Sequence, residues 1–257
     1  MNHNYINLQN IYRYFLKYPY LRRRLRLARA KMQSLSGYSD PFYDLAEIAS
    51  KRNADLFMDI GCHHGETLLR FIEAGLSARV AAFDPLPQNL SHARQTLARH
   101  SNIEYIQSAI SDADGSAQFY VNKNEQTSSL LDNACGNTKS FYSDTQHDQC
   151  INVPVLKLDT WVSGLNPKPT RIVIKCDTQG AEGKVISGGL DTLSNSVIAF
   201  YAEVMLGNMY EGQASFDDLR ALLEGKCGMM LKNIYPCLHD HRGQAVQMDA
   251  LWIRAKN

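Results

Sequence analysis

From about residue 55 onward the chain alternates short apolar runs with amphipathic helical stretches, and this alternation limits the fold more than any other feature. The runs at 56–60 and 171–176 are mostly apolar, which is typical of strands buried on both faces. Strand–helix alternation of this kind predicts a parallel sheet with helices on both faces. The sequence therefore predicts an α/β fold.

The expected elements can be placed from the same pattern. Strands are expected at 56–60, 79–83, 103–107, 171–176, 197–204, 229–235 and 250–253, and helices at 65–74, 87–100, from 181 and at 215–223. The last two strands are expected to form an antiparallel hairpin at the sheet edge, with a polar turn at Gly243. Between about Asn122 and Gln149 the chain is polar and shows no periodicity, which is typical of a lid, a binding loop or a solvated insertion.

Composition excludes several protein classes. The chain has 257 residues, of which 44% are hydrophobic and 21% charged, and these values exclude disordered, collagenous and coiled-coil proteins. No apolar run reaches the ~18 residues of a membrane span, and the first residues lack the pattern of a secretory signal. Six cysteines without CxxC spacing are typical of reduced thiols. We therefore expect a cytoplasmic location.

Residues 1–52 differ from the rest and are predicted to form a basic helical N-terminal extension to a domain at 53–257. Residues 1–31 contain eight basic side chains and no acidic one, which leaves 19 basic against 26 acidic side chains in the remainder. Apolar residues from Ile11 to Met32 recur at three- and four-residue steps, as in an amphipathic helix. Asp40 and Pro41 predict the start of another helix that ends near Arg52.

The basic arm has three open interpretations. Its apolar stripe packs on the domain or on a second copy of the chain in a homodimer. Alternatively, it contacts anionic lipid at the inner face of the membrane, as basic amphipathic helices do. In the third interpretation it recognises an anionic substrate such as a phosphorylated glycan. Nucleic acid is disfavoured because the remainder of the chain is acidic.

The stretch from Phe57 to Thr67 carries the most specific chemistry, because a buried strand passes through a glycine-bracketed turn into a helix. Gly61 permits a sharp turn, and Gly65 lets backbone donors approach a ligand. A dinucleotide site would show GxGxxG, whereas this chain shows DxGxxxG with Asp59 where a phosphate would be repelled. A ligand with an ammonium group fits Asp59 better, which favours S-adenosylmethionine over NAD.

A second acid supports a nucleoside ligand. Asp84 ends the second strand, 23 positions after Gly61, where a carboxylate accepts hydrogen bonds from ribose hydroxyls. The turn after the third strand, with Ser108 and Ala109, lies where the adenine ring would bind. With the residues of the first turn, these form the predicted cofactor site: Asp59, Gly61, His63, Gly65, Thr67, Asp84, Ser108, Ala109 and Asp177.

Five segments in this order resemble the FkbM family of S-adenosylmethionine-dependent methyltransferases: DIGCHHG at 59–65, AFDP at 82–85, TSSL at 127–130, KCDTQGAE at 175–182 and DAL at 249–251. The resemblance covers about residues 55–255. It implies the seven-stranded, mostly parallel class I methyltransferase sheet, which is Rossmann-like, and O-methylation of a hydroxyl on a sugar, a glycan or a secondary metabolite.

The resemblance also implies residue roles. Asp59, Gly61 and Gly65 would bind the methionine part of the cofactor and Asp84 the ribose, while Asp177 and Glu182 would face the transferred methyl group. Two positions depart from the family pattern. His63 stands where the family typically has Asn, and Gln179 stands where it typically has Glu, which removes a carboxylate near the substrate.

The predicted catalytic residues are Asp177, Glu182, Glu203 and His64. Asp177 and Glu203 follow strands at the carboxyl edge, where open parallel sheets bind ligands. Methyl transfer is an in-line displacement that depends on positioning, and a general base adds ~10²–10⁴-fold. Asp177, Glu203 and His64 are the candidates for the base, of which we favour Asp177. Capping of the following helix is the structural alternative for Asp177 and Glu182.

The sequence gives weaker support for a metal site or for a function other than catalysis. Cys62, His63 and His64 are adjacent, so their side chains are expected to point in different directions and not to share a metal ion. Cys237, His239 and His241 alternate, which is a better zinc spacing, but no fourth ligand is evident. We therefore expect no metal. The alternative to an enzyme is a catalytically silent cofactor-binding domain that acts as an interaction module in a biosynthetic assembly.

Overall fold

The computed structural model describes residues 39–134, 147–240 and 242–255. These residues form an eight-stranded sheet in the order β10-β11-β8-β7-β1-β2-β3, with β9 also paired to β11. Five adjacent strands are parallel: β8 (Val197–Met205), β7 (Ile172–Cys176), β1 (Leu56–Ile60), β2 (Arg79–Phe83) and β3 (Ile103–Ile106). Three strands are antiparallel to their partners: β9 (Met229–Ile234), β10 (Leu238–His239) and β11 (Ala245–Arg254).

The predicted α/β fold with a mostly parallel sheet is confirmed. All seven predicted strands belong to this sheet, and the eighth is the two-residue β10. The last two predicted strands do pair antiparallel, as β9 and β11. The prediction differs at β11, which begins at Ala245 instead of residue 250 and lies between β8 and β9.

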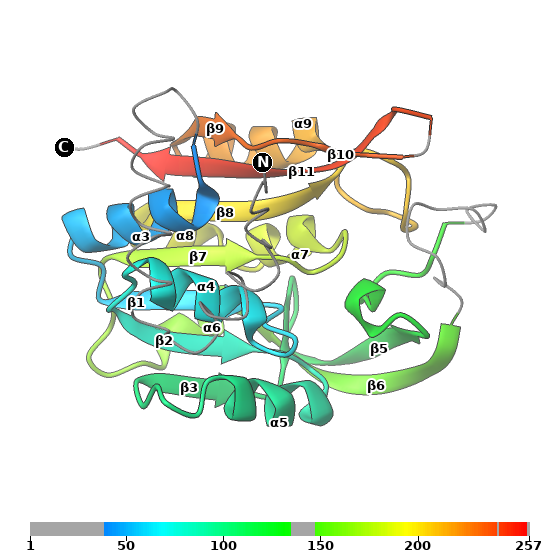
Figure 1. The fold of residues 1–257 in the computed structure, drawn as a ribbon, viewed down its shortest axis with the longest axis horizontal. Helices are drawn as coiled ribbons and strands as arrows, with labels where there is room; N and C mark the ends of the chain where they lie inside the picture. The colour runs from blue at the N-terminus through cyan, green and yellow to red at the C-terminus, as the bar shows by residue number, and fades with distance from the viewer. Residues whose placement is uncertain (1–38, 135–146, 241, 256–257) are drawn as a thin grey trace, which may run out of the picture.

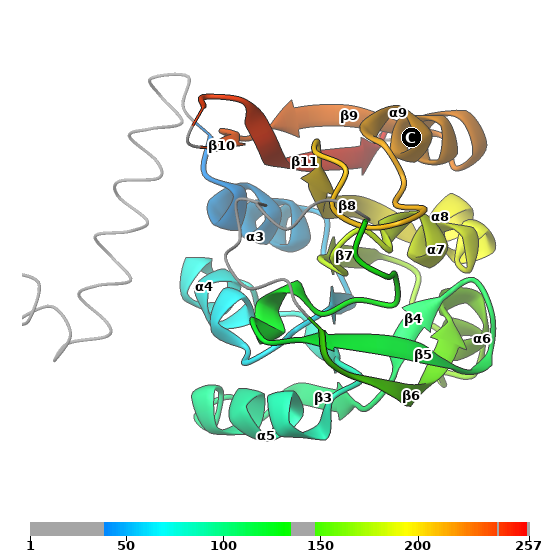
Figure 2. The ribbon, with the colours of Figure 1, turned by 90° about the vertical axis from the view of Figure 1, so that its right-hand side faces the viewer.

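Helices cover both faces of the sheet, as Figures 1 and 2 show. One face carries α3 (Pro41–Lys51), α4 (Glu66–Ala74) and α5 (Pro87–Thr96). The other face carries α6 (Leu158–Ser163), α7 (Glu182–Ser187), α8 (Leu190–Asn195), α9 (Phe216–Arg220) and the π-helix η2 (Ala221–Lys226). Strand residues alternate between the two cores: Met58 packs toward the α6–α9 face and Phe57 toward the α3–α5 face.

Local sequence explains several helix ends. Asp40 Oδ1 accepts hydrogen bonds from the backbone N–H groups of Phe42 and Tyr43, so the predicted cap of α3 is confirmed. Ser215 and Asp218 form a capping box at α9. The helix predicted at 87–100 ends earlier, at Thr96. No helix in the described ranges is both long enough and apolar enough to span a bilayer.

Helix α3 lies within the predicted N-terminal extension, and it packs on the domain. Its buried side chains Leu45, Ala46 and Ala49 join the core of the α3–α5 face, together with Phe57 and Phe71. The basic arm that precedes it lies outside the described residues, as do its predicted helices. The boundary between residues 52 and 53 therefore stays a prediction.

A second sheet was not predicted. It has the order β4-β6-β5, with β4 (Ala109–Ser111), β5 (Gly115–Asn122) and β6 (His147–Lys157). Figure 1 shows β5 and β6 beyond the carboxyl ends of the parallel strands. Only a few side chains, such as Phe119 and Val153, are buried in its small core, so the apolar periodicity of these strands is weak. Strand β6 begins at His147, so the last three residues of the loop predicted from Asn122 to Gln149 belong to this strand. The described part of that loop contains the short 3-10 helix η1 (Glu125–Thr127).

Gly61 joins the main sheet to the loop after β7. Its φ is +79°, and a Cβ atom at this position would lie 1.8 Å from the carbonyl oxygen of Asp177. The loop after β7 is held against the end of β1, because the backbone N–H of Asp177 donates to the carbonyl of Ile60 at 3.0 Å. A side chain at residue 61 would therefore separate these two loops.

We expect Gly61→Ala to destabilise the fold much more than Gly212→Ala. Gly212 has a similar φ of +73°, but a Cβ atom added there would have nothing within 4 Å, so this variant isolates the backbone strain. That strain costs roughly 1–2 kcal/mol, and the steric clash at Gly61 should add at least about 2 kcal/mol. Urea unfolding of the two variants measures the difference, and equal losses of stability would contradict the close approach of the two loops.

Candidate active site

A cavity of about 260 Å³ lies at the carboxyl edge of the parallel strands. Its walls come from the ends of β1, β2, β7 and β8, from the start of β4 and from the segment around η1. Nine of the predicted site residues line it: Gly61, His63, His64, Thr67, Asp84, Ser108, Ala109, Asp177 and Glu203. The structure thus brings together residues that are up to 142 positions apart in the chain.

Three predicted site residues do not line the cavity. Asp59 is fully buried in β1. Gly65 is the N-cap of α4, with a φ of +78° and with Ala93 and Leu97 of the α5 region at its back. Glu182 is buried at the start of α7, where its Oε1 accepts hydrogen bonds from the backbone N–H and the hydroxyl of Thr178 at 2.8 and 3.0 Å. Glu182 therefore holds the loop after β7 and does not face the cavity.

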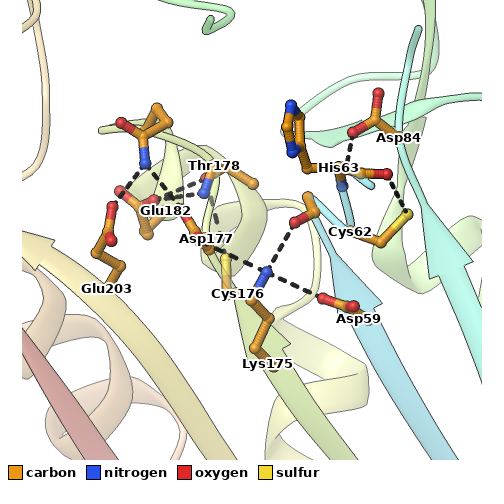
Figure 3. A network of polar contacts seen from close by, with 12 residues as sticks. Asp59, Cys62, His63, Asp84, Lys175, Cys176, Asp177, Thr178, Glu182 and Glu203 are labelled. Atoms are coloured by element: carbon orange, nitrogen blue, oxygen red, sulfur yellow. Dashed lines mark hydrogen bonds and ion pairs between the residues drawn. The ribbon is translucent and has the colours of Figure 1, made fainter. Parts of the chain in front are cut away.

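Lys175 is the main site residue that sequence reasoning missed. Its Nζ lies 3.0 Å from Asp59 Oδ1 and 3.6 Å from Asp177 Oδ2, and it donates to the carbonyl oxygen of Gly61 at 2.7 Å. Figure 3 shows this ammonium group at the centre of the network. Because Asp59 and Lys175 are directly opposed in the parallel register of β1 and β7, they point to the same face. A lysine inside an apolar strand was the available signal, since a buried charge needs a partner.

Burial and the neighbouring carboxylates have opposite effects on the charge of Lys175. Burial alone would lower the pKa of Lys175, but the carboxylates of Asp59 and Asp177 raise it above its usual range, so Lys175 stays positively charged. An ammonium group of a ligand in the cavity could not reach Asp59 without displacing Lys175. The sequence predicted a contact between Asp59 and an ammonium group of the ligand, but the ammonium group of Lys175 takes this place.

The Asp84 end of the cavity is rich in hydrogen-bonding groups. Asp84 accepts hydrogen bonds from the backbone N–H groups of His63 (3.0 Å) and Leu86 (2.9 Å) and from Asn89 Nδ2 (3.1 Å). Burial raises the pKa of Asp84 to about 6, against the lowering effect of these donors. Asn89 Oδ1 and His63 Nε2 are buried without a hydrogen-bond partner among the described residues. Unsatisfied polar atoms beside a carboxylate fit a hydroxyl-rich ligand such as a nucleoside.

The opposite end is acidic. Gln179 donates from Nε2 to Asp177 Oδ1 (2.9 Å) and to Glu203 Oε2 (2.6 Å), while Gln247 donates to the other oxygen of Glu203. Burial raises the pKa of Glu203 well above its usual range, and the negative charge of Asp177 adds to this effect. The side chain of Asp177 is 29% exposed and lines the cavity. Asp177 therefore presents an accessible carboxylate to a substrate at this end of the cavity.

The segment Thr127–Leu130 packs beside this acidic end. Ser129 donates from Oγ to the backbone carbonyl of Gln179 at 2.8 Å, and the Tyr210 hydroxyl donates to the carbonyl of Thr127 at 2.9 Å. Ser128 and Leu130 line the cavity. The segment predicted as either a lid or a solvated loop is thus part of the cavity wall. No sequence signal could place it, because its contacts come from residues about 50 to 80 positions away.

Of the predicted zinc-spaced set Cys237, His239 and His241, the third member lies outside the described residues. Cys237 is half-buried beside β10 and His239 is exposed on it.

The coupling between Lys175 and Asp59 can be measured. Lys175→Met leaves Asp59 buried without a counter-charge, and we expect a loss of roughly 3–5 kcal/mol of unfolding free energy. Adding Asp59→Asn should restore part of this loss. The loss of stability in the double variant should therefore be smaller than the sum of the losses in the two single variants by at least about 1 kcal/mol. Denaturant unfolding of the two single variants and the double variant tests this. Additive losses would show that the two side chains are not coupled.

Glu182 should make stability depend on pH. Burial raises its pKa from 4.5 to about 7, so the folded state holds a proton in this range that the unfolded state releases. Its contribution is therefore greatest below about pH 4.5 and is lost as the pH rises through 7. Glu182→Gln keeps an acceptor for Thr178 but does not titrate. The free energy of unfolding of Glu182→Gln, relative to that of the original chain, should therefore increase between about pH 4.5 and 7. The increase is about 1.4 kcal/mol for each unit by which the pKa of Glu182 differs between the folded and unfolded states.

Chemical unfolding at several pH values between 4 and 8 measures this difference. Glu104→Gln makes the same substitution at an exposed residue and is the matched control. A difference between Glu182→Gln and the original chain that does not change with pH would contradict the assigned burial of this carboxylate.

Comparison with known proteins identifies the family. A model of the methyltransferase FkbM domain matches residues 59–229. The 2-O-methyltransferase NoeI of Sinorhizobium fredii (strain NBRC 101917 / NGR234) is 29% identical over 174 residues, which cover 66% of this chain and 70% of that protein.

Two solved structures resemble the chain at low sequence identity. The methyltransferase FkbM of Methylobacillus flagellatus KT gives a TM-score of 0.48 at 15% identity and covers 78% of this chain and 44% of that chain, so the present chain spans less than half its length. The precorrin-6y C5,15-methyltransferase of Geobacter metallireducens GS-15 gives 0.42 at 13% identity and covers 82% and 87%. The family match extends over more than half of the chain and includes β2, β7, β8 and the carboxyl end of β1, all of which end at the cavity. The chain belongs to the methyltransferase FkbM family and is a methyltransferase.

Proposed function

We propose that this chain transfers a methyl group from S-adenosylmethionine to a hydroxyl oxygen of a sugar, a glycan or a secondary metabolite. The observation that carries the proposal is one cavity with a nucleoside-type end at Asp84 and an acidic end at Asp177 and Glu203. The family membership supports methyl transfer. The relative named as a 2-O-methyltransferase supports oxygen as the acceptor atom.

Different residues of the cavity would bind different parts of the cofactor. Asp84 and Asn89 would accept hydrogen bonds from the ribose hydroxyls and the base, and the turn at Ser108 and Ala109 would flank the base. When bound, S-adenosylmethionine supplies an electrophilic methyl group and a positively charged sulfonium. The carboxylates at the far end favour this cationic group, because opposite charges attract strongly in a partly buried site.

Asp177 is the residue we propose as the general base. It is exposed to the cavity, whereas Glu182 faces away from it. Glu203 also lines the cavity, but both of its oxygens accept hydrogen bonds, from Gln179 and Gln247, so it is the weaker candidate. His64 lines the cavity beside His92 and Glu125. Lys175 positions Asp177 and offsets its negative charge.

Two conservative variants separate binding from turnover. We expect Asp84→Asn to weaken S-adenosylmethionine binding by about 10- to 100-fold, because a charge-assisted hydrogen bond contributes roughly 1.5–3 kcal/mol. We expect Asp177→Asn to bind the cofactor within about threefold of the original chain and to lose ~10²-fold or more of its turnover. Calorimetry measures the affinity, and transfer of a labelled methyl group into a cell extract measures turnover.

Glu104→Gln is the control for both measurements, because this exposed side chain is remote from the cavity lining. Unchanged turnover in Asp177→Asn would remove this residue from the mechanism. Cofactor binding by the original chain without any labelled product would instead support the silent cofactor-binding domain, and an absence of cofactor binding would contradict both functions.

A further inference from the structure

We propose that His63, His64 and Glu125 form a binding site for a divalent transition-metal ion such as Zn²⁺ at the rim of the cavity. One potential ligand atom from each residue lies within 4.8 Å of the other two. All three residues line the cavity. The proposal does not rest on the proposed methyl transfer, since it concerns metal binding alone.

The backbone at His63 explains how adjacent histidines come to share a site. Adjacent residues in extended or helical backbone point in different directions, which was the basis for expecting no shared ion. His63 instead has a φ of +45°, in the left-handed region. Its ring stacks on that of His64 with centroids 3.7 Å apart, so both imidazoles lie on the same side of the turn. Cys62 follows the original expectation, since it is buried in the core of the α3–α5 face.

Glu125 completes the set from a distant part of the chain. It belongs to η1, and its Oε2 lies 3.9 Å from His64 Nε2. Zinc–nitrogen and zinc–oxygen distances are close to 2.1 Å, so two ligand atoms of one ion are at most about 4.2 Å apart. The present spread of 4.8 Å therefore needs to close by less than about 1 Å, which side-chain rotation can supply.

The donor set indicates the class of metal. Two imidazoles and one carboxylate favour zinc and similar transition metals over Mg²⁺ or Ca²⁺, which prefer oxygen ligands only. His63 Nε2 is buried and has no hydrogen-bond partner among the described residues, so coordination would satisfy it. His92 Nδ1 lies 3.2 Å from His64 Nε2, so a metal ion bound through this nitrogen would replace that hydrogen bond. Three protein ligands leave a coordination position open toward the cavity.

The test is calorimetric titration of ZnCl₂ into the full chain after treatment with a chelator. We expect one ion for each chain. Glu125→Gln and His64→Ala should each weaken binding by about tenfold or more, since each removes one ligand. Glu125 is 45% exposed, so Glu125→Gln tests the site without disturbing the core. A titration with Co²⁺ should give a visible absorption spectrum that is lost in the same two variants.

His239→Ala is the matched control, because His239 belongs to the competing zinc-spaced set near β10 and is exposed. It should leave Zn²⁺ affinity unchanged. The proposal is overturned if the full chain binds no Zn²⁺, if Glu125→Gln and His64→Ala both bind as tightly as the original chain, or if His239→Ala alone abolishes binding.

Discussion

The ion pair between Lys175 and Asp59 is the interaction on which the site depends. Lys175 contacts two carboxylates and the carbonyl of Gly61, and so it connects the ends of β1 and β7 to the loop that carries Asp177. A buried ion pair adds little net stability compared with apolar residues of the same volume. Its effect here is on position, because any shift of one strand end would leave a buried charge without its partner.

The same alternation that builds the two cores places the charges. Four strand residues pack toward the α3–α5 face: Phe57 of β1, Val173 of β7, Tyr201 of β8 and Leu251 of β11. Every second residue along each strand points to the same face. At the ends of β1, β7 and β8 this period places Asp59, Lys175 and Glu203 on one face. Asp59 is directly opposite Lys175, and Glu203 lies two residues beyond Tyr201, the partner of Lys175 on β8. The carboxylates outnumber the lysine. Burial raises the pKa of Glu203, and repulsion by the negative charge of Asp177 adds to this effect. An acidic site of this kind suits a cationic ligand better than an anionic one.

The sequence was sufficient for the parallel strands and insufficient for the second sheet. Strands such as β7 are buried along their whole length and therefore appear as apolar runs. Strands β5 and β6 each bury fewer than half of their side chains, so neither periodicity nor composition distinguishes them from a polar loop. The cavity wall near Glu125 follows β5 of this sheet in the chain, and the predicted site residues therefore included none from Glu125 to Leu130.

Residue roles were harder to predict than residue positions. Most of the predicted site residues line the cavity, but Asp59 and Glu182 act beneath it, because a motif gives the order of residues along the chain and not their depth. The left-handed backbone at His63 also could not be expected, since such a conformation is uncommon for residues other than glycine.

Gln179 shows how a departure from a family pattern is accommodated. Its backbone is left-handed, with a φ of +54°, and its amide lies between Asp177 and Glu203 and donates to both. The amide oxygen lies 3.1 Å from the Tyr210 hydroxyl, whose single hydrogen is shared between this oxygen and the carbonyl of Thr127. A glutamate at this position would place a third carboxylate between two others with a single lysine below them. The glutamine replaces that repulsion with two charge-assisted hydrogen bonds, and in this way it keeps Asp177 directed into the cavity without a further positive charge.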